Sequence, residues 1–323
     1  MLRSLVLEQV GQVEVGAFAT CERLASGHVL IGGQELEHRL LLDPTLGRVE
    51  RLPRGVDAIH VGEGVCAETT SEGDLRLVAR DGAELAHIDG RGDLADVRFG
   101  PSGAVLWEIG ERRRWEVRAR VGFHDAAIGR MLAEAELPEP HPELRAWAVE
   151  AVHPITESLV ASSVERHVAV ELTSNARALT VRPLAFESFV DWMPGGTALL
   201  ATSFDGWLSV HRWPSGEVAR RVGTARLRDL LDDTLGFHGR VIDDDRAIVD
   251  TERGRLVVVD LADPGAEVIE LRLAGDARET DLHWLELGRT GRILTGRRDD
   301  RVLKIWDGTA AVRAIPARRV GLR

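Results

Sequence analysis

The chain of 323 residues is poor in several residue types, and each shortage excludes a class of protein. Cysteine occurs only at Cys21 and Cys66, which argues against a disulfide framework, and we expect two free, buried thiols. No apolar run approaches the roughly 20 residues needed to cross a bilayer. The first residues, MLRSLVLEQVGQ, hold too short an apolar stretch for a secretory signal. We therefore expect a soluble, cytoplasmic protein that does not enter a membrane.

Lysine, asparagine and tyrosine are also scarce. Lys304 is the only lysine among 41 basic residues, Asn175 is the only asparagine, and tyrosine is absent. A Schiff base with a lysine amine could therefore form only at Lys304. The formal net charge of −11 argues against nucleic-acid binding, which normally requires a basic face.

The sequence contains no recognisable catalytic or metal-binding motif. It has no glycine-rich phosphate loop between a strand and a helix, and no pair of histidines at i and i+4 on a predicted helix. No group of cysteines and histidines has zinc-site spacing. We accordingly predict no catalytic residue, no metal site and no cofactor.

What the chain does contain is a recurring set of short strands. Residues 189–218 hold two alternating apolar runs joined by Asp205-Gly206, with a third run before them and a fourth after Ser215-Gly216. Asp-Gly between alternating runs is a strong hairpin signal, because both central residues of a type I′ turn need positive φ. Four antiparallel strands in about 40 residues are typical of one β-propeller blade.

The same unit recurs along the whole chain, and each copy can be placed by the turn between its first and second strands. Seven such turns indicate a seven-bladed, all-β propeller that occupies residues 1–323 as one domain. Two longer spacings predict insertions, a proline-rich loop near 138–145 and a short helix near 224–236. The seven turns are centred on Ser26, Glu63, Ser102, Thr156, Gly195, Asp244 and Thr290.

The pattern resembles a WD-repeat β-propeller of a divergent bacterial kind. Trp306-Asp307 stands where that family ends the third strand of a blade with Trp-Asp. In other blades the dipeptide is replaced by Leu42-Asp43, Val170-Glu171, Val259-Asp260 and His211-Arg212. The resemblance implies an interaction scaffold or sensor platform, and it places the loops between second and third strands on the face most used for partners.

Those loops supply our candidate partner-binding residues. Phe204 and Trp207 flank the Asp205-Gly206 turn, and aromatic and arginine side chains are enriched at interface hot spots. Arginine clusters occupy the corresponding loops of two other blades, and guanidinium groups could bind a carboxylate, a phosphate or an acidic helix. The predicted contact set is Phe204, Trp207, Arg112, Arg113, Arg114, Arg297 and Arg298.

The alternative function is a propeller enzyme, or a small-ligand or metal binder, that uses the central channel. It would need a convergent group of polar side chains on the innermost strands. The residues available for it are His60, Asp96, Asp191, Arg240 and His283. The competing interpretation of His60 and His283 is structural, with one ring nitrogen of each bonded to a backbone carbonyl.

The N-terminal segment offers a way to complete the last blade. Residues 4–10, SLVLEQV, alternate in polarity and precede the first complete blade. We predict that they pair with the C-terminal blade, as the resemblance implies. The competing interpretation is that 311–317 supplies the fourth strand of that blade, while 4–10 adds at an edge.

Overall fold

The computed structural model describes residues 2–309 with the exception of 15–19, 25, 33–37, 44–47, 71–73, 89–92, 115, 139–146, 164–165, 173–177, 203–206, 223–234, 252, 263–267, 276–281, 288–290 and 298–300. The described elements are strands, apart from one 3-10 turn, η1 (Pro194–Gly196). Within these residues, no helix is long and apolar enough to cross a membrane. The strands form seven sheets, which belong to two compact units of the chain.

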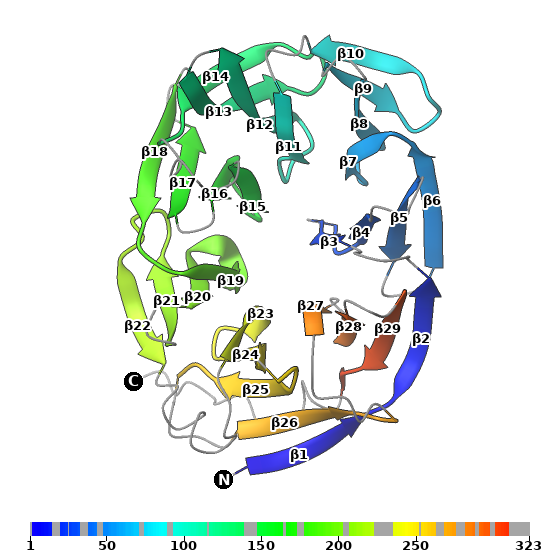
Figure 1. Cartoon of the computed structure of the whole chain (residues 1–323), viewed down its shortest axis with the longest axis vertical. Coiled ribbons are helices and arrows are strands. Elements are labelled where there is room, and N and C mark those ends of the chain that lie inside the picture. The colour runs from blue at the N-terminus through cyan, green and yellow to red at the C-terminus, as the bar shows by residue number, and fades with distance from the viewer. Residues whose placement is uncertain are drawn as a thin grey trace. The chain divides into compact units, whose positions relative to one another are not determined.

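The first unit comprises residues 1–51, 188–211 and 218–323. Its strands, labelled in Figure 1, are β1 (Leu2–Leu7), β2 (Gln9–Glu14), β3 (Thr20–Arg23), β4 (Val29–Gly32), β5 (His38–Asp43), β6 (Arg48–Arg54), β19 (Ser188–Trp192), β20 (Ala198–Thr202), β21 (Leu208–Arg212), β22 (Val218–Val222), β23 (Leu235–Asp243), β24 (Arg246–Thr251), β25 (Leu256–Asp260), β26 (Val268–Leu273), β27 (Leu282–Leu287), β28 (Arg292–Arg297) and β29 (Val302–Asp307). They form the sheets β3-β4-β5-β6, β19-β20-β21-β22, β23-β24-β25-β26-β1 and β27-β28-β29-β2, and the ends of β6 (52–54) and β21 (212) are counted with the second unit.

The second unit comprises residues 52–187 and 212–217. Its strands are β7 (Val56–His60), β8 (Val65–Thr69), β9 (Leu75–Ala79), β10 (Glu84–Ile88), β11 (Asp93–Phe99), β12 (Val105–Arg114), β13 (Glu116–Asp125), β14 (Met131–Glu136), β15 (Ala148–Val152), β16 (Ser158–Ser163), β17 (Arg166–Leu172) and β18 (Leu179–Leu184). Each of its three sheets follows chain order, β7 to β10, β11 to β14 and β15 to β18. The seven predicted blades are therefore confirmed.

The burial of each strand follows its position in its sheet. The second and third strands of most blades are buried along most of their length, such as Arg246–Thr251 and Leu256–Asp260. Outer strands such as Arg48–Arg54 are mostly exposed. A continuous apolar run is what a strand needs when both of its faces are covered. The hydrophobic clusters accordingly join neighbouring sheets, as in the cluster that links β19–β22 to β23–β26.

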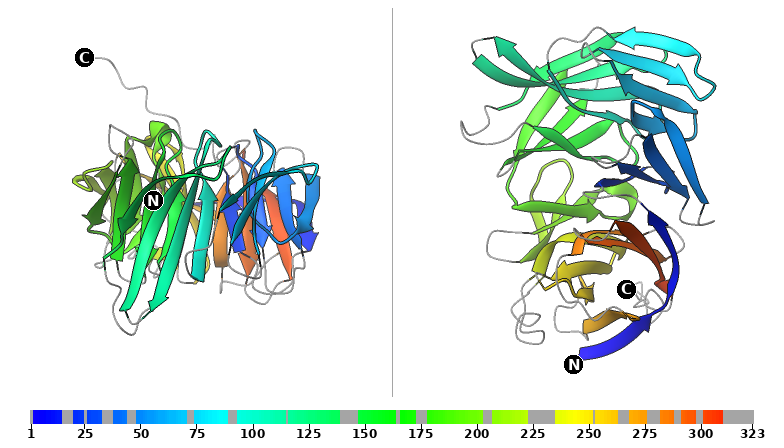
Figure 2. Two further views of the ribbon diagram at one scale, coloured as in Figure 1. Left: turned by 90° about the horizontal axis from the view of Figure 1, so that it is seen from above. Right: turned by 45° about the vertical axis from the view of Figure 1, so that its right-hand side comes forward.

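The N-terminal segment forms two strands rather than the single predicted one. Residues Gln9–Glu14 pair antiparallel with β29, so β2 completes the last blade as the fourth strand. Residues Leu2–Leu7 instead pair in parallel with β26 and add a fifth strand to the preceding sheet, and Figures 1 and 2 both show β1 beside β26. The prediction was thus right for the end of segment 4–10 and wrong for residues 4–7.

The segment divides into two strands at Glu8 because Leu7 and Glu8 accept main-chain hydrogen bonds from two different sheets. The Leu7 carbonyl accepts a bond from the Ala274 amide at 2.9 Å, and the Glu8 carbonyl accepts one from the Asp307 amide at 3.0 Å. The competing segment 311–317 lies outside the described residues.

The helix predicted over 224–236 is wrong at its C-terminal end, since Leu235 and Gly236 begin β23 and Leu235 pairs with Thr251. Residues 224–234 lie outside the described part.

Both cysteines are free thiols, with Cys66 buried and Cys21 partly buried. This confirms the expectation of free thiols. The expected burial is also confirmed for Cys66, whereas Cys21 is only partly buried.

His167 on β17 is a buried titratable group that makes folding pH-dependent. Its ring packs 4.6 Å from that of Phe186, and burial lowers the pKa of His167 from 6.5 to about 4. Between pH 6.5 and 4 the unfolded chain therefore binds a proton that the folded chain does not. Stability should fall as the pH decreases through this window, by up to about 3 kcal/mol from this residue.

We expect His167→Gln to remove this part of the pH dependence. Urea unfolding of wild type and variant at several pH values between 4 and 7.5 measures it. As the pH falls, the free energy of unfolding of wild type should decrease more than that of the variant. A difference that stays constant across the range would show that His167 does not carry the effect.

Candidate functional site

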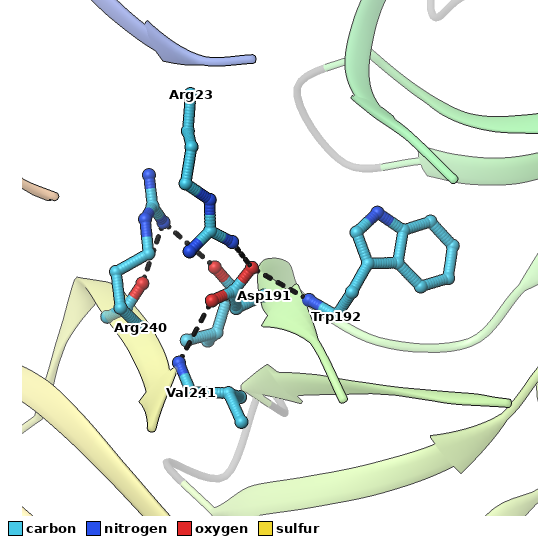
Figure 3. Close-up of polar contacts among 7 residues, drawn as sticks. Arg23, Asp191, Trp192, Arg240 and Val241 are labelled. Atoms are coloured by element: carbon cyan, nitrogen blue, oxygen red, sulfur yellow. Dashed lines mark hydrogen bonds and ion pairs between the residues drawn. The ribbon is translucent and has the colours of Figure 1, made fainter. Parts of the chain in front are cut away.

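An aspartate on the innermost strand β19 organises the inner edge of the first unit. The pairing of β19 with β20 has a bulge between Phe189 and Asp191, and Asp191 follows it. One carboxylate oxygen accepts the Trp192 amide and the other accepts the Val241 amide of β23, both at 2.9 Å. The Asp191 carboxylate is also ion-paired with Arg23 of β3 (Figure 3). The side chain therefore links three first strands of the unit.

Arg240 adds a cation to the same place. Its guanidinium donates to the carbonyl oxygens of Val190 at 3.1 Å and Gly239 at 2.7 Å. Figure 3 shows Arg23 and Arg240 converging above Asp191 from β3 and β23. Asp191 is almost completely buried, whereas the Arg23 side chain keeps about a third of its surface exposed. The arrangement ties strands together by charge and by main-chain hydrogen bonds.

Asp96 has the same role in the second unit. It also follows a bulge, on β11, and one carboxylate oxygen accepts the Val97 amide at 2.8 Å. The other accepts the Val149 amide of β15 at 3.0 Å, and Arg98 pairs with the carboxylate. Each aspartate accepts a hydrogen bond from the first strand of the following blade. The donor is in each case the amide of the residue just before the bulge in that strand, Val149 before Glu150 and Val241 before Ile242. The two acids are thus equivalent joints between blades.

The remaining candidates of the channel hypothesis do not join these groups. His60 is the last residue of β7, with Nε2 3.3 Å from the Pro101 carbonyl and Nδ1 accepting the Glu63 amide at 3.1 Å. This is the structural role that we considered for it. The side chain of His283 lies outside the described residues. Within the described part, no three His, Cys, Asp or Glu side chains form a group that could hold a metal ion.

The predicted partner-binding residues are only partly described. Trp207 lies directly before β21 and is half-buried, whereas Phe204 and Arg298 lie outside the described residues. Arg297 is the last residue of β28. The prediction that 111–114 form a loop was wrong, because β12 continues through Arg114 and pairs with β13 up to Arg114–Glu116. Ladder pairing extends this hairpin up to the single residue 115.

A buried hydrogen bond joins two strands at the Trp306-Asp307 dipeptide of the last blade. The Trp306 indole on β29 donates to the Thr295 hydroxyl of β28 at 2.8 Å, and both side chains are buried. In the β19–β22 blade, His211 takes the position of the tryptophan and its Nε2 lies 2.7 Å from the Ser209 hydroxyl. A same-strand contact thus replaces the bond between strands.

Sequence reasoning missed a buried charged cluster in the β11–β14 blade. Glu108, Arg120 and His124 are all buried, and Glu108 Oε2 lies 2.9 Å from His124 Nε2. Arg120 lies 3.7 Å from Glu108 and 3.4 Å from Glu134. Gly122 makes the room, since a Cβ there would come within 3.0 Å of His124. Arg120 and His124 on one face of an otherwise apolar run, and Glu108 within another, were the available signal.

These observations define the class of protein: the chain is a seven-bladed β-propeller with four-stranded antiparallel blades. No model of a known protein family matches it, and no curated protein matches it significantly. Among solved structures it is similar to the β-propeller domain of Cps50 (Swd1) from Myceliophteria thermophila, with a TM-score of 0.62 and 10% identity. The match covers 93% of this chain and 99% of that one. At this identity the likeness concerns the fold alone.

Proposed function

We propose that the chain is a non-enzymatic scaffold or sensor platform for protein–protein interaction. The observation that carries this proposal is the structural role of Asp96 and Asp191, the acidic residues of the innermost strands. Asp96 and Asp191 accept bonds from the main chain of the following first strand and pair with arginines, so their carboxylates join blades. The groups from which a channel-centred site would be built thus serve the rigidity of the scaffold.

A rigid propeller suits such a role because its loops vary without cost to the core. Trp306-Asp307 ends β29, the third strand of its blade, which supports the resemblance to WD-repeat propellers, many of which are interaction scaffolds. Fold alone does not fix function, so the proposal needs a direct test.

The test is capture of the partner from the native host with this chain as bait. We expect Trp207→Ala, or the double change Arg112→Ala and Arg113→Ala, to weaken capture at least tenfold, about 1.4 kcal/mol, while folding stays intact. Affinity for the identified partner should be measured by titration.

The double change Arg48→Ala and Arg51→Ala on the exposed strand β6 is the matched control, and it should bind as wild type does. If both test variants fold and retain wild-type affinity, the partner does not use this face. A bait that retains stoichiometric metal or a small ligand and captures no protein would favour the channel hypothesis instead.

A further inference from the structure

The strand β1 is the outer strand of a sheet that has five strands, whereas the other described sheets have four. It pairs with β26 in parallel over six residues, from Leu2–Val268 to Leu7–Leu273. The described strands include none on its other side, and Figure 1 shows β1 outside β26. An outer strand presents main-chain donors and acceptors along its edge, and another strand can pair with them.

The main-chain groups at this edge are those of Ser4 and Val6. The Leu7 carbonyl accepts the Ala274 amide at 2.9 Å, so the main-chain groups of Leu7 point toward β26. Successive residues of a strand direct these groups to opposite sides. Those of Leu5 therefore also point toward β26, whereas those of Ser4 and Val6 point away from it.

The other six outer strands each carry a feature that disfavours further pairing. The strands β2, β10, β14 and β22 have an irregular register with their neighbours, and β6 and β18 contain Pro53 and Pro183. Bulges and prolines are devices by which proteins protect sheet edges. The strand β1 has no proline and pairs with β26 without a break in register. Among the described outer strands, β1 is thus the one whose edge is suited to pairing.

The side chains along β1 also favour contact with another strand. Val6 is 65% exposed, although a β-branched side chain is most stable in a strand with neighbours to pack on. Arg3 is the only charged residue of Leu2–Leu7. If two copies of β1 pair antiparallel about the middle of the strand, the two Arg3 side chains lie on opposite sides of that point. No like charges are then directly opposite.

We infer that β1 pairs antiparallel with β1 of a second copy of this chain. The inference goes beyond the proposed function and does not depend on it. A two-fold axis normal to the sheet brings residues of equal parity opposite one another. The outward main-chain groups of one copy, those of Ser4 and Val6, then lie opposite the outward groups of the other and can form hydrogen bonds with them.

A second copy fits this edge because it supplies an identical unprotected edge. Once two β1 strands have paired, the described outer strands that remain carry bulges or prolines, so assembly stops at two copies. Stable interfaces bury about 1,200 Å² or more, and two paired strands of six residues cover less than that. The dimer should therefore be weak, and its population should depend on protein concentration.

Sedimentation velocity of the full chain from about 5 µM to about 300 µM protein tests the inference, since this range suits a weak dimer. The sedimentation coefficient of wild type should rise toward that of a dimer. Val6→Pro removes an outward amide at an exposed position and should raise the dissociation constant at least tenfold. Val6→Thr is the matched control, because it keeps the amide and the branched shape, and it should change the constant less than twofold.

A second variant keeps the test decisive if Val6→Pro does not fold, which circular dichroism shows. Val6→Lys keeps the amide but adds a positive charge to each copy of the paired edge, which already carries Arg3. It should raise the dissociation constant at least threefold, as a lysine on a sheet edge disfavours pairing.

Hydrogen exchange of residues 1–10, followed by mass spectrometry, distinguishes a second copy from other occupants of the edge. In wild type this segment should exchange more slowly at about 300 µM than at about 5 µM protein, and in Val6→Pro equally at both. Three results would overturn the inference. They are a wild type that stays monomeric throughout, a dimer as strong in a folded Val6→Pro or Val6→Lys variant as in wild type, and protection independent of concentration, which would place another segment of the same chain on the edge.

Discussion

Replacing Asp191 by alanine should lower the free energy of unfolding by about 3–5 kcal/mol, the usual cost of removing one partner from a buried ion pair. The change removes the acceptors of the Trp192 and Val241 amides and the counter-charge of Arg23. A buried donor left without a partner costs about 1–3 kcal/mol by itself. Urea denaturation followed by circular dichroism measures the loss.

Two further variants separate the charge from the hydrogen bonds. Asp191→Asn keeps one acceptor and should cost less than the alanine change. Adding Arg23→Met to Asp191→Ala should recover part of the loss, because the partly buried cation then no longer lacks its counter-charge, and the double-mutant cycle reports the coupling. Asp81, exposed in a turn where it caps the Ala83 amide, is the control, and its alanine variant should lose at most about 1 kcal/mol. A loss below 1 kcal/mol for Asp191→Ala would show that the carboxylate is not a joint.

The blades could be predicted because their signals are local. Each of the seven expected turns falls between the first and second strands of a blade, for example Ser26 between β3 and β4 and Gly195 between β19 and β20. Gly195 has φ +76°, a conformation that favours glycine at such a turn. Middle strands are buried on both faces, so their apolar runs are continuous and easily recognised.

The inner joints could not be predicted, because their partners are distant in sequence. Arg23 and Asp191 are 168 residues apart, and Asp96 and Val149 are 53 apart. Nothing in the sequence near Asp191 indicates that a bulge turns its carboxylate toward the next first strand. An aspartate between two apolar residues, as in Val190-Asp191-Trp192, was the only local signal.

The extent of a hairpin is likewise hard to read from residue types. Glu111–Arg114 has the composition of a solvated turn, yet the residues continue β12 because β13 offers a complete ladder opposite them. Backbone pairing outweighed side-chain preference there. The same holds at the N-terminus, where one alternating segment is shared between a parallel and an antiparallel neighbour.

Because the N-terminal segment contributes a strand to each of two sheets, we expect its deletion to cause the largest loss of stability. A chain without residues 1–14 loses β1 and β2, and with them Leu7, which is 1% exposed in the cluster around Trp306, and Val13, buried against β29. Each truncation of such a side chain typically costs about 2–5 kcal/mol for leucine and somewhat less for valine. Together with the lost ladder bonds, the deletion should remove about 5 kcal/mol or more, which is within the total stability of many domains.

We therefore expect the shortened chain to be largely unfolded at 25 °C by circular dichroism and thermal melting. The neighbours Val6 and Leu7 provide a matched pair of point variants, since Val6 is 65% exposed on the same strand. Leu7→Ala should cost about 2–5 kcal/mol and Val6→Ala at most about 0.5 kcal/mol. Removing residues 1–7 alone should give an intermediate loss, because β2 still completes the last blade. If the chain without residues 1–14 melts as wild type does, another segment must supply the fourth strand beside β29.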